Sequence, residues 1–331
     1  SSGSTPPQPP SDEVDPNVWT VRRILDWTIE YLGKHGSESA RLDAEILLAH
    51  ARGCQRIELY TRYNEIMTDQ QKAVMRDLVR RRAKAEPVAY LVGFREFFSL
   101  SFEVNSDVLI PRPETETLVL EAIEILNTLP TPKILEIGTG SGCIAVSIAN
   151  RCPDATVVAI DISEKAIDVA KRNAQLHGVS DRIEFRRGDM LRPVEANERF
   201  DMLVSNPPYV CSHEIAGLAA DVRDHEPHGA LDGGKDGLDF VRTIVADGPV
   251  LLNPGAVMLI EIDPDQAGPL CEFSQQVDTI ASCRGIHDLS GQLRIMKLQL
   301  DGIMPTIPRP DDVDDVASST ENPPDTENPP D

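Results

Sequence analysis

Apolar residues recur at helical spacing in the first quarter of the chain. The three series are Val21, Ile24, Leu25, Thr28 and Leu32; Leu42, Ile46, Leu47 and Ala49; and Val74, Leu78 and Val79. Spacings of three and four residues place such side chains on one face of a helix. We therefore predict an all-helical domain over residues 17–86.

A short segment with a different pattern follows. Pro87 is expected to end the helical region, because proline lacks the N–H that a helix interior needs. Residues 88–110 then carry β-branched and aromatic residues in short runs, which are typical of a hairpin. We predict that residues 87–110 form a β-hairpin connector.

From residue 131 onward, apolar runs of strand length alternate with helical patterns. The expected strands are 133–137, 156–160, 182–185, 201–205, 256–261 and 293–298, and the expected helices are 142–150, 164–177, 237–247 and 266–276. Such alternation indicates an α/β domain with a mostly parallel sheet. We place this domain at residues 111–300.

The two ends of the chain differ in composition from the domains. Residues 1–16 are rich in serine, proline and acid, and from Asp301 onward nine acidic residues stand against one basic residue, Arg309. Segments of this kind bury too little apolar surface to fold. Residues 1–16 and 301–331 are predicted to be disordered, with an acidic docking tail as the alternative for the second.

Charge and cysteine content narrow the class of protein. The net charge is −22 over 331 residues, which argues against a protein that mainly grips a nucleic-acid backbone. The six cysteines are scattered without C-x-x-C pairs, so no metal site is expected and a reducing, cytoplasmic location is predicted. No apolar run has the length of a membrane span, so no membrane partner is expected.

A basic run stands out against this acidity. It comprises Arg76, Arg80, Arg81, Arg82 and Lys84, on the third expected helix of the helical domain. The run is either a solvated helix face or a docking surface for an RNA-binding or acidic partner.

A glycine-rich loop follows the first expected strand. It consists of Glu136, Ile137, Gly138, Thr139, Gly140, Ser141 and Gly142, and a helix follows. Glycines let the backbone approach a ligand, and a helix start offers free N–H groups. Dinucleotide sites use G-x-G-x-x-G instead, and Glu136 would face a pyrophosphate unfavourably. We predict that the loop binds S-adenosyl-L-methionine, whose amino group is cationic; a structural turn is the alternative.

Two further acids follow the next strands. Asp161 ends the second expected strand, where its carboxylate can accept both ribose hydroxyls. A helix N-cap is the alternative for Asp161. Asp189 follows the third strand and can reach the adenine amino group, with Met190 packing near the ring; a loop turn is the alternative there.

The fourth strand delivers the tetrapeptide Asn206-Pro207-Pro208-Tyr209. Ligands in open α/β sheets bind beyond the carboxyl ends of the strands, so this tetrapeptide borders the cofactor. The Asn206 side-chain oxygen and the Pro207 carbonyl can accept both N–H groups of a planar amide, and the prolines stiffen them. Tyr209 offers an aromatic wall. We predict that Asn206, Pro207 and Tyr209 are catalytic, the alternative being a strand-ending turn.

These residues together resemble the release-factor glutamine methyltransferase family over about residues 17–300. The segments specific to that resemblance are 41–45, 93–98, 109–116, 226–227 and 230–238. The resemblance implies a Rossmann-like S-adenosylmethionine-dependent methyltransferase sheet of seven strands, the last antiparallel, with a small N-terminal helical domain for substrate docking.

The resemblance also implies an activity. The enzyme would methylate the side-chain amide nitrogen of the glutamine in the Gly-Gly-Gln motif of peptide-chain release factors. Target contacts would lie at Asn206, Pro207, Pro208 and Tyr209 and at Arg112. Phe97 would also contact the target and lie near the reacting methyl. The cofactor contacts implied are the glycine loop, Asp161, Asp189 and Met190, and we also expect Asn206 to contact the cofactor.

Two departures and two rival functions remain. Asp263 stands where the family usually has glycine, and residues 290–294 match its final hairpin loosely. The rivals are methylation of a glutamine in a ribosomal protein and adenine N(6)-methylation of nucleic acid. No basic target-recognition domain is visible, so nucleic acid is not the expected substrate. An intact tetrapeptide argues against an inactive scaffold.

Overall fold

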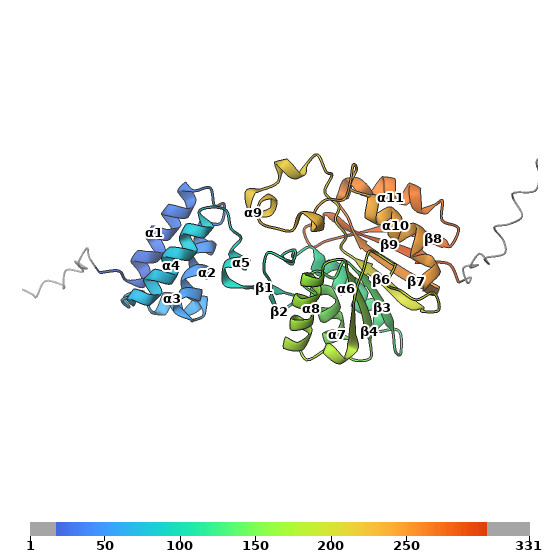
Figure 1. Ribbon diagram of the computed structural model, residues 1–331, viewed down its shortest axis with the longest axis horizontal. Coiled ribbons are helices and arrows are strands. Elements are labelled where there is room, and N and C mark those ends of the chain that lie inside the picture. The colour runs from blue at the N-terminus through green and yellow to red at the C-terminus, as the bar shows by residue number, and fades with distance from the viewer. Residues whose placement is uncertain (1–17, 303–331) are drawn as a thin grey trace, which may run out of the picture.

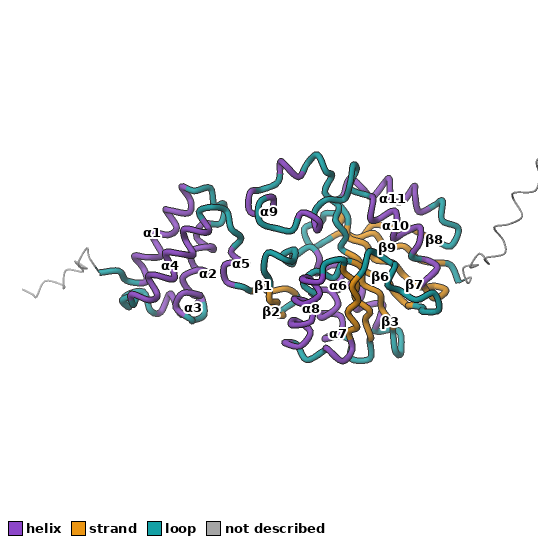
Figure 2. The backbone as a smooth tube through the Cα atoms, in the orientation of Figure 1, coloured by secondary structure: helices purple, strands orange, loops and turns teal. Residues whose placement is uncertain are grey.

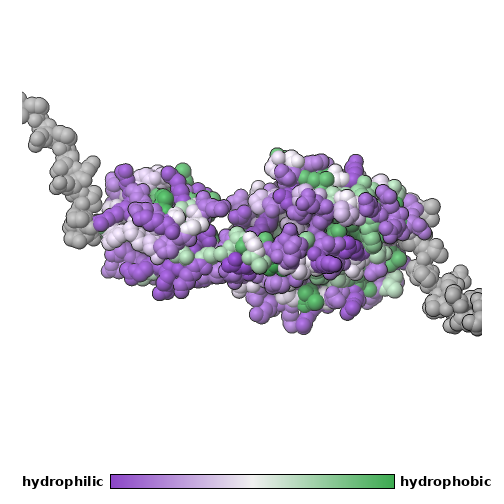
Figure 3. Space-filling view, turned by 90° about the horizontal axis from the view of Figure 1, so that it is seen from above, coloured by the Kyte–Doolittle hydropathy of each residue, from purple (hydrophilic) through white to green (hydrophobic). Residues whose placement is uncertain are grey.

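The computed structural model describes residues 18–302, in which a helical domain is joined to an α/β domain (Figure 1). The tails predicted at the two ends lie outside the described residues, except for Asp301 and Gly302. Within the described range, none of the helices combines the length and apolar character needed to cross a membrane. The face seen in Figure 3 is mainly hydrophilic, with scattered apolar patches.

The helical domain consists of α1 (Val21–Lys34), α2 (Ala40–Arg52), α3 (Arg56–Thr61) and α4 (Asp69–Arg82). Their apolar faces enclose one core. The predicted face of α1 is confirmed, but Leu42 and Val74 are exposed, because α2 and α4 turn Leu48 and Met75 inward instead. The apolar residues of α2 and α4 are spaced so that more than one face of each helix could be the buried face. Packing against α1 determines which face is buried.

The basic run does not act as a unit. Arg82 is largely buried, and its Nε donates to Asp43 Oδ2 over 2.7 Å. Arg80 is 70% exposed and pairs with Asp77 one turn away. Arg82 is therefore part of neither a solvated helix face nor a docking surface. It links α4 to α2 inside the domain.

The Arg82–Asp43 pair gives a stability prediction. Replacing Arg82 by leucine should destabilise the helical domain by about 3 kcal/mol, because Asp43 keeps a buried charge without its cation. Both tryptophans of the chain, Trp19 and Trp27, lie in this domain, so their fluorescence during urea unfolding reports on it selectively. Arg80→Leu is the matched control, with an expected change within about 0.5 kcal/mol. Equal unfolding midpoints for the two variants would contradict the prediction.

The connector contains a helix and a hairpin. The helix α5 (Val88–Val92) starts directly after Pro87, so the expectation that Pro87 ends the helical region is wrong. Proline is tolerated at a helix start, where its missing N–H would have no partner in any case. The strands β1 (Phe94–Phe97) and β2 (Leu100–Glu103) then pair antiparallel.

The α/β domain is built on a seven-stranded sheet, in the order β5-β4-β3-β6-β7-β9-β8 (Figure 2). Its strands are β3 (Lys133–Ile137), β4 (Thr156–Asp161), β5 (Ile183–Arg187), β6 (Phe200–Ser205), β7 (Leu252–Glu261), β8 (Ile280–His287) and β9 (Leu293–Leu300). The strands β3 to β7 are parallel, and β9 runs antiparallel to both its neighbours, β7 and β8. The expected seven strands with the last antiparallel are confirmed.

Helices cover both faces of this sheet. One face carries α6 (Thr115–Leu126), α7 (Cys143–Arg151) and α8 (Glu164–Leu176), and the other carries α10 (Asp239–Asp247) and α11 (Ala267–Ser274). Alternation along β3 sends Ile134 into the first layer and Leu135 into the second. The short helix α9 (Ala220–Arg223) lies in the long segment between β6 and α10 (Figure 1).

Candidate active site

The glycine loop turns sharply at the carboxyl end of β3. Gly138, Gly140 and Gly142 have φ angles of 76°, 54° and 81°, which residues with a Cβ rarely adopt. At Gly142 space is short as well, since a Cβ there would lie 3.0 Å from the Ala170 Cβ on α8. The sequence thus needs glycine at this position both for backbone angle and for helix packing.

Glu136 lies beneath this loop and is fully buried. Thr139 Oγ1 donates to its Oε2 over 2.7 Å, whereas Oε1 has no hydrogen bond of standard geometry with the described residues. Burial raises the pKa of the Glu136 carboxyl to about 7, and the bond from Thr139 opposes the rise. A buried carboxyl beneath the loop favours a cationic group above it when it is ionised.

Asp161 ties the glycine loop to the start of α8. Its Oδ2 accepts from the Gly140 N–H over 2.8 Å, and its Oδ1 accepts from the Ser163 N–H over 2.9 Å. Ser163 itself caps α8, accepting from the Ala166 N–H, so Asp161 is not the helix cap. Burial raises the pKa of Asp161, and the two backbone bonds oppose that rise.

A first cavity of about 380 Å³ opens above these groups. It brings together residues predicted for the cofactor and for the target: Gly138, Thr139, Gly140, Ser141, Asp161, Asp189, Met190, Asn206, Pro207, Pro208 and Arg112. Glu136 and Gly142 lie behind its wall. The structure thus gathers on one surface residues that are widely separated along the chain.

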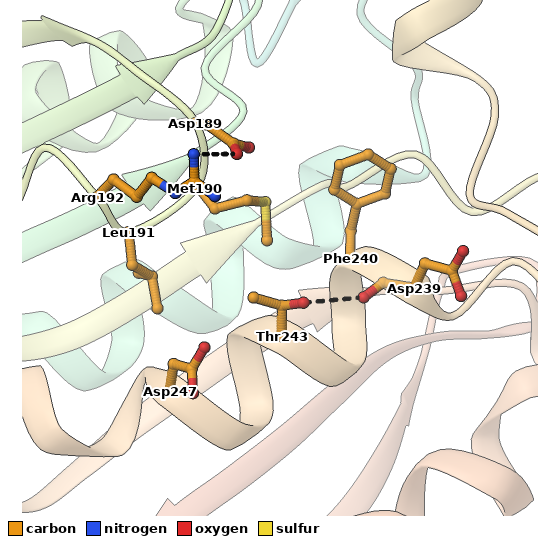
Figure 4. Close-up of a pocket in the computed structure, with 8 residues that line it drawn as sticks. All are labelled: Asp189, Met190, Leu191, Arg192, Asp239, Phe240, Thr243 and Asp247. Carbon is orange, nitrogen blue, oxygen red and sulfur yellow. Dashed lines mark hydrogen bonds and ion pairs between the residues drawn. The ribbon is translucent and has the colours of Figure 1, made fainter.

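A side pocket of about 370 Å³ adjoins this cavity at Asp189, Met190 and Phe240 (Figure 4). Met190 has a left-handed φ of 54°, and its side chain points into the space beside Phe240 of α10. Asp189 pairs with Arg192 over 3.3 Å. Sequence reasoning missed Phe240, because one aromatic residue in an amphipathic helix gives no signal that separates a cavity wall from a core position.

The tetrapeptide begins where β6 ends. Ser205 Oγ donates to the Ile137 carbonyl over 2.8 Å, which holds the end of β6 against β3. Asn206 Nδ2 donates to Thr115 Oγ1 at the start of α6 over 3.1 Å. The Asn206 carbonyl is also close to the glycine loop, 3.9 Å from where a Cβ on Gly138 would stand.

A second cavity of about 920 Å³ lies on the other side of the tetrapeptide. The two cavities share Leu109, Arg112, Asn206, Pro207 and Ala230. Tyr209 lines the second cavity only, so the structure places it on the side away from the glycine loop. Burial raises the pKa of the Tyr209 hydroxyl.

The segment 230–238 packs directly on the tetrapeptide and requires glycine to do so. A Cβ on Gly233 would lie 2.7 Å from the Pro208 carbonyl oxygen, and one on Gly237 would lie 2.2 Å from that of Tyr209. Gln266 Nε2 also donates to the Tyr209 carbonyl over 2.8 Å. Gly233, Gly237 and Gln266 therefore fix the backbone that presents the tetrapeptide.

Asp263, one turn before Gln266, supports the contact between Gln266 and the Tyr209 carbonyl. Its side chain accepts from the Asp265 N–H over 3.1 Å, and its own N–H donates to Gln266 Oε1 over 3.1 Å. This reciprocal cap orients the Gln266 side chain toward Tyr209. Aspartate at this position is thus compatible with the site, and Asp263 also lines the second cavity.

Arg112 is held by a buried acid. Its Nη2 donates to Glu226 Oε1, while Glu226 Oε2 accepts from the Ile110 N–H over 3.1 Å. The Glu226 side chain is only 1% exposed, so Arg112 neutralises a charge that would otherwise be buried alone. The pair places Arg112 at the junction of the two cavities.

Phe97 is not brought to either cavity. It is 1% exposed and packs edge-on against Phe102 at a ring distance of 6.0 Å, in the core beside α6 and α7. Phe97 is the buried residue of β1, whose other three residues are exposed. Within residues 18–302, no three His, Cys, Asp or Glu side chains gather as metal ligands would.

A parallel sheet with this strand order, a glycine loop after its central strand and an antiparallel last strand define the Rossmann-like fold of S-adenosylmethionine-dependent methyltransferases. The fold is similar to that of the hMettl16 catalytic domain in complex with MAT2A 3′UTR hairpin 6. The TM-score is 0.52 at 18% identity, over 65% of this chain and 80% of that one. Residues 117–222 match the family described as the methyltransferase small domain. The protein is a methyltransferase.

The N-terminal domain and the full-length relatives define its family. Residues 23–93 match the PrmC N-terminal domain. The release factor glutamine methyltransferase of Rhodopirellula baltica is 46% identical over 285 residues, 85% of this chain and 96% of that protein. That of Geobacter sulfurreducens is 44% identical over 252 residues, 76% of this chain and 87% of that protein. The chain belongs to the release factor glutamine methyltransferase family.

Proposed function

We propose that this protein transfers a methyl group from S-adenosyl-L-methionine to the side-chain amide nitrogen of the glutamine in the Gly-Gly-Gln motif of a peptide-chain release factor. The observation that carries the proposal is the meeting of two cavities at Asn206 and Pro207. One cavity has the groups that suit the cofactor, and the larger one leaves room for a protein loop. Relatives over most of the chain are release factor glutamine methyltransferases.

The residues of the first cavity fit S-adenosylmethionine. The Asp161 carboxylate on the wall of this cavity complements ribose hydroxyls, and the buried Glu136 beneath the loop favours a cationic amino group above it when it is ionised. Asp189 and Met190 would hold the adenine end, with Phe240 as a further wall. When bound, the cofactor supplies a methyl group activated by the sulfonium charge.

The tetrapeptide acts by orientation and electrostatics. An amide nitrogen is a poor nucleophile because its lone pair is delocalised into the carbonyl group. Asn206 Oδ1 and the Pro207 carbonyl accept its two N–H groups and hold it against the first cavity. Holding the hydrogens also favours the positive charge that develops on the nitrogen, which then loses a proton to solvent. No strong base is needed for that step.

The charge of the second cavity supports a basic protein segment as substrate. Its lining includes four acidic side chains, Glu214, Asp236, Asp263 and Asp265, against two basic ones, Arg112 and Arg294. A negative lining attracts cationic residues and repels phosphates. This favours a basic protein loop over nucleic acid, although a ribosomal protein would share that property.

Radiolabelled methyl transfer separates these substrates. Equal amounts of a purified release factor, a ribosomal protein extract and DNA are incubated with the protein and labelled S-adenosylmethionine. We expect label in the release factor, and none in a release factor whose Gly-Gly-Gln glutamine is replaced by asparagine. Label in the ribosomal proteins or in DNA alone would replace the proposed substrate by one of its rivals.

Asp161 gives a prediction for the cofactor itself. Asp161→Ala should weaken S-adenosylmethionine binding at least about tenfold, because a charge-assisted pair with the ribose is lost and Gly140 loses its acceptor. Titration calorimetry measures the affinity, and Asp154→Ala, at an exposed acid remote from the cavity, is the control. Tight NAD binding without any S-adenosylmethionine signal would refute the cofactor assignment.

A further inference from the structure

The Asn206 side chain has two ends of opposite hydrogen-bonding character, and the proposed reaction needs one of them to face the target. Oδ1 accepts hydrogen bonds, whereas Nδ2 donates them. An amide turned the other way would set a donor against the N–H of the target and repel it. The protein therefore has to fix the rotation of this one side chain.

Thr115 is the residue that contacts the donor end. Asn206 Nδ2 donates to Thr115 Oγ1 over 3.1 Å, and no hydrogen bond to Asn206 Oδ1 comes from any residue between 18 and 302. Thr115 is 1% exposed and begins α6, where its N–H donates to the Arg112 carbonyl over 3.2 Å. Its hydroxyl is therefore held at one place beside the amide.

A hydroxyl alone does not set the direction of this bond, because it donates as readily as it accepts. Glu261, the last residue of β7, supplies the asymmetry. Its side chain is fully buried, and neither carboxylate oxygen has a hydrogen bond of standard geometry with the described residues. Burial raises the pKa of Glu261 to about 7, and the neighbouring Thr115 hydroxyl opposes the rise.

The pairing of these groups determines which way the amide points. In its ionised form, which prevails above pH 7, the Glu261 carboxylate only accepts, so it attracts the proton of the Thr115 hydroxyl toward itself. The lone pairs of Thr115 Oγ1 are then directed at Asn206, where only Nδ2 can use them. Oδ1 is left on the side away from Thr115, and Asn206 lines both cavities.

We propose that Thr115 is a positioning residue that holds Asn206 Nδ2, so that Asn206 Oδ1 faces the junction of the two cavities. This inference rests on the proposed function, because that function gives Oδ1 a target. Thr115 acts through Asn206, and Glu261 orients the Thr115 hydroxyl. Two variants separate the hydroxyl from side-chain size: Thr115→Val removes it at nearly constant volume, and Thr115→Ser retains it.

Amide proton exchange tests the contact without any substrate. In the full chain labelled with nitrogen-15 asparagine, the Asn206 side-chain signals are identified by their loss in Asn206→Ala. Thr115→Val should speed exchange of these protons with solvent about tenfold, which is the loss of protection expected from one hydrogen bond. Thr115→Ser should stay within about threefold of wild type. Unchanged exchange in Thr115→Val overturns the proposal, whatever the substrate proves to be.

Kinetics test whether the contact acts through Asn206. In single-turnover transfer to a release factor, Thr115→Val should slow the reaction about tenfold and Thr115→Ser should restore it, with cofactor affinity within about twofold throughout. In an Asn206→Ala background, Thr115→Val should add less than about twofold, because its partner is already gone. An equal slowing in both backgrounds means that Thr115 acts independently of Asn206, and the proposal fails. If wild type transfers nothing to the release factor, the proposed function fails, while amide exchange still decides the role of Thr115.

Discussion

Asn206→Ala is expected to slow methyl transfer about a hundredfold while leaving S-adenosylmethionine affinity nearly unchanged. The substitution removes an acceptor that acts on the target nitrogen as it becomes positively charged, so the loss falls on kcat. The glycine loop and Asp161, which suit the cofactor, have no hydrogen bond to the Asn206 side chain. Single-turnover transfer to a release factor measures the rate, and calorimetry measures the affinity.

Asn206→Asp sharpens this prediction. The aspartate keeps an acceptor of the same size but adds a negative charge at the wall of the first cavity. That charge favours the sulfonium of the bound cofactor, which is neutralised during transfer. We expect cofactor binding at least as tight as in wild type, with transfer far slower. Asn150→Ala, on the exposed side of α7, is the control, and wild-type rates in both Asn206 variants would show that Asn206 is only a turn residue.

Gly237→Ala is expected to slow transfer by about a hundredfold as well, although Gly237 lines neither cavity. The new Cβ would lie 2.2 Å from the Tyr209 carbonyl oxygen and equally near Gln266 Nε2, so the backbone of the tetrapeptide has to move. A displacement of about 1 Å at reacting groups typically costs this much. The same single-turnover assay measures the effect.

Gly255→Ala is the matched control for that variant. Gly255 and Gly237 share a φ of 74°, so alanine strains both backbones alike, but a Cβ on Gly255 meets nothing within 4 Å. We expect Gly255→Ala to lower stability by about 1 kcal/mol with near-normal turnover. An equal loss of turnover in the two variants would assign the effect to backbone strain and not to contact with Tyr209.

The order of elements in the α/β domain was predictable because each core strand and its helix carry a local pattern. Helices α7, α8, α10 and α11 lie within two residues of their predicted bounds. The strand β8 was not predicted from its own residues, because it is an edge strand whose side chains are mostly exposed. A regular pattern of apolar residues is found only in strands with a buried face. Exposed edge strands are therefore hard to predict from their sequence.

The candidate site motifs could be predicted from the sequence where their residues are adjacent in the chain. The glycine loop and the tetrapeptide are each contiguous, and each follows a buried strand, so their residue types and order predict a loop for a cationic cofactor and a pair of amide acceptors. Family membership follows from similarity over most of the chain and from the N-terminal domain. These features depend on the backbone near each motif, which local sequence controls.

Only the tertiary structure determined which residues from distant parts of the chain lie beside the motifs. The burial of Phe97 in the core, the wall formed by Phe240, and the bond from Asn206 to Thr115 each depend on how separate elements pack. No spacing along the chain encodes these relations, since Thr115 and Asn206 are 91 residues apart. The sequence determined which groups present the acceptors, and the packing of α6 against the end of β6 determined which way the Asn206 amide points.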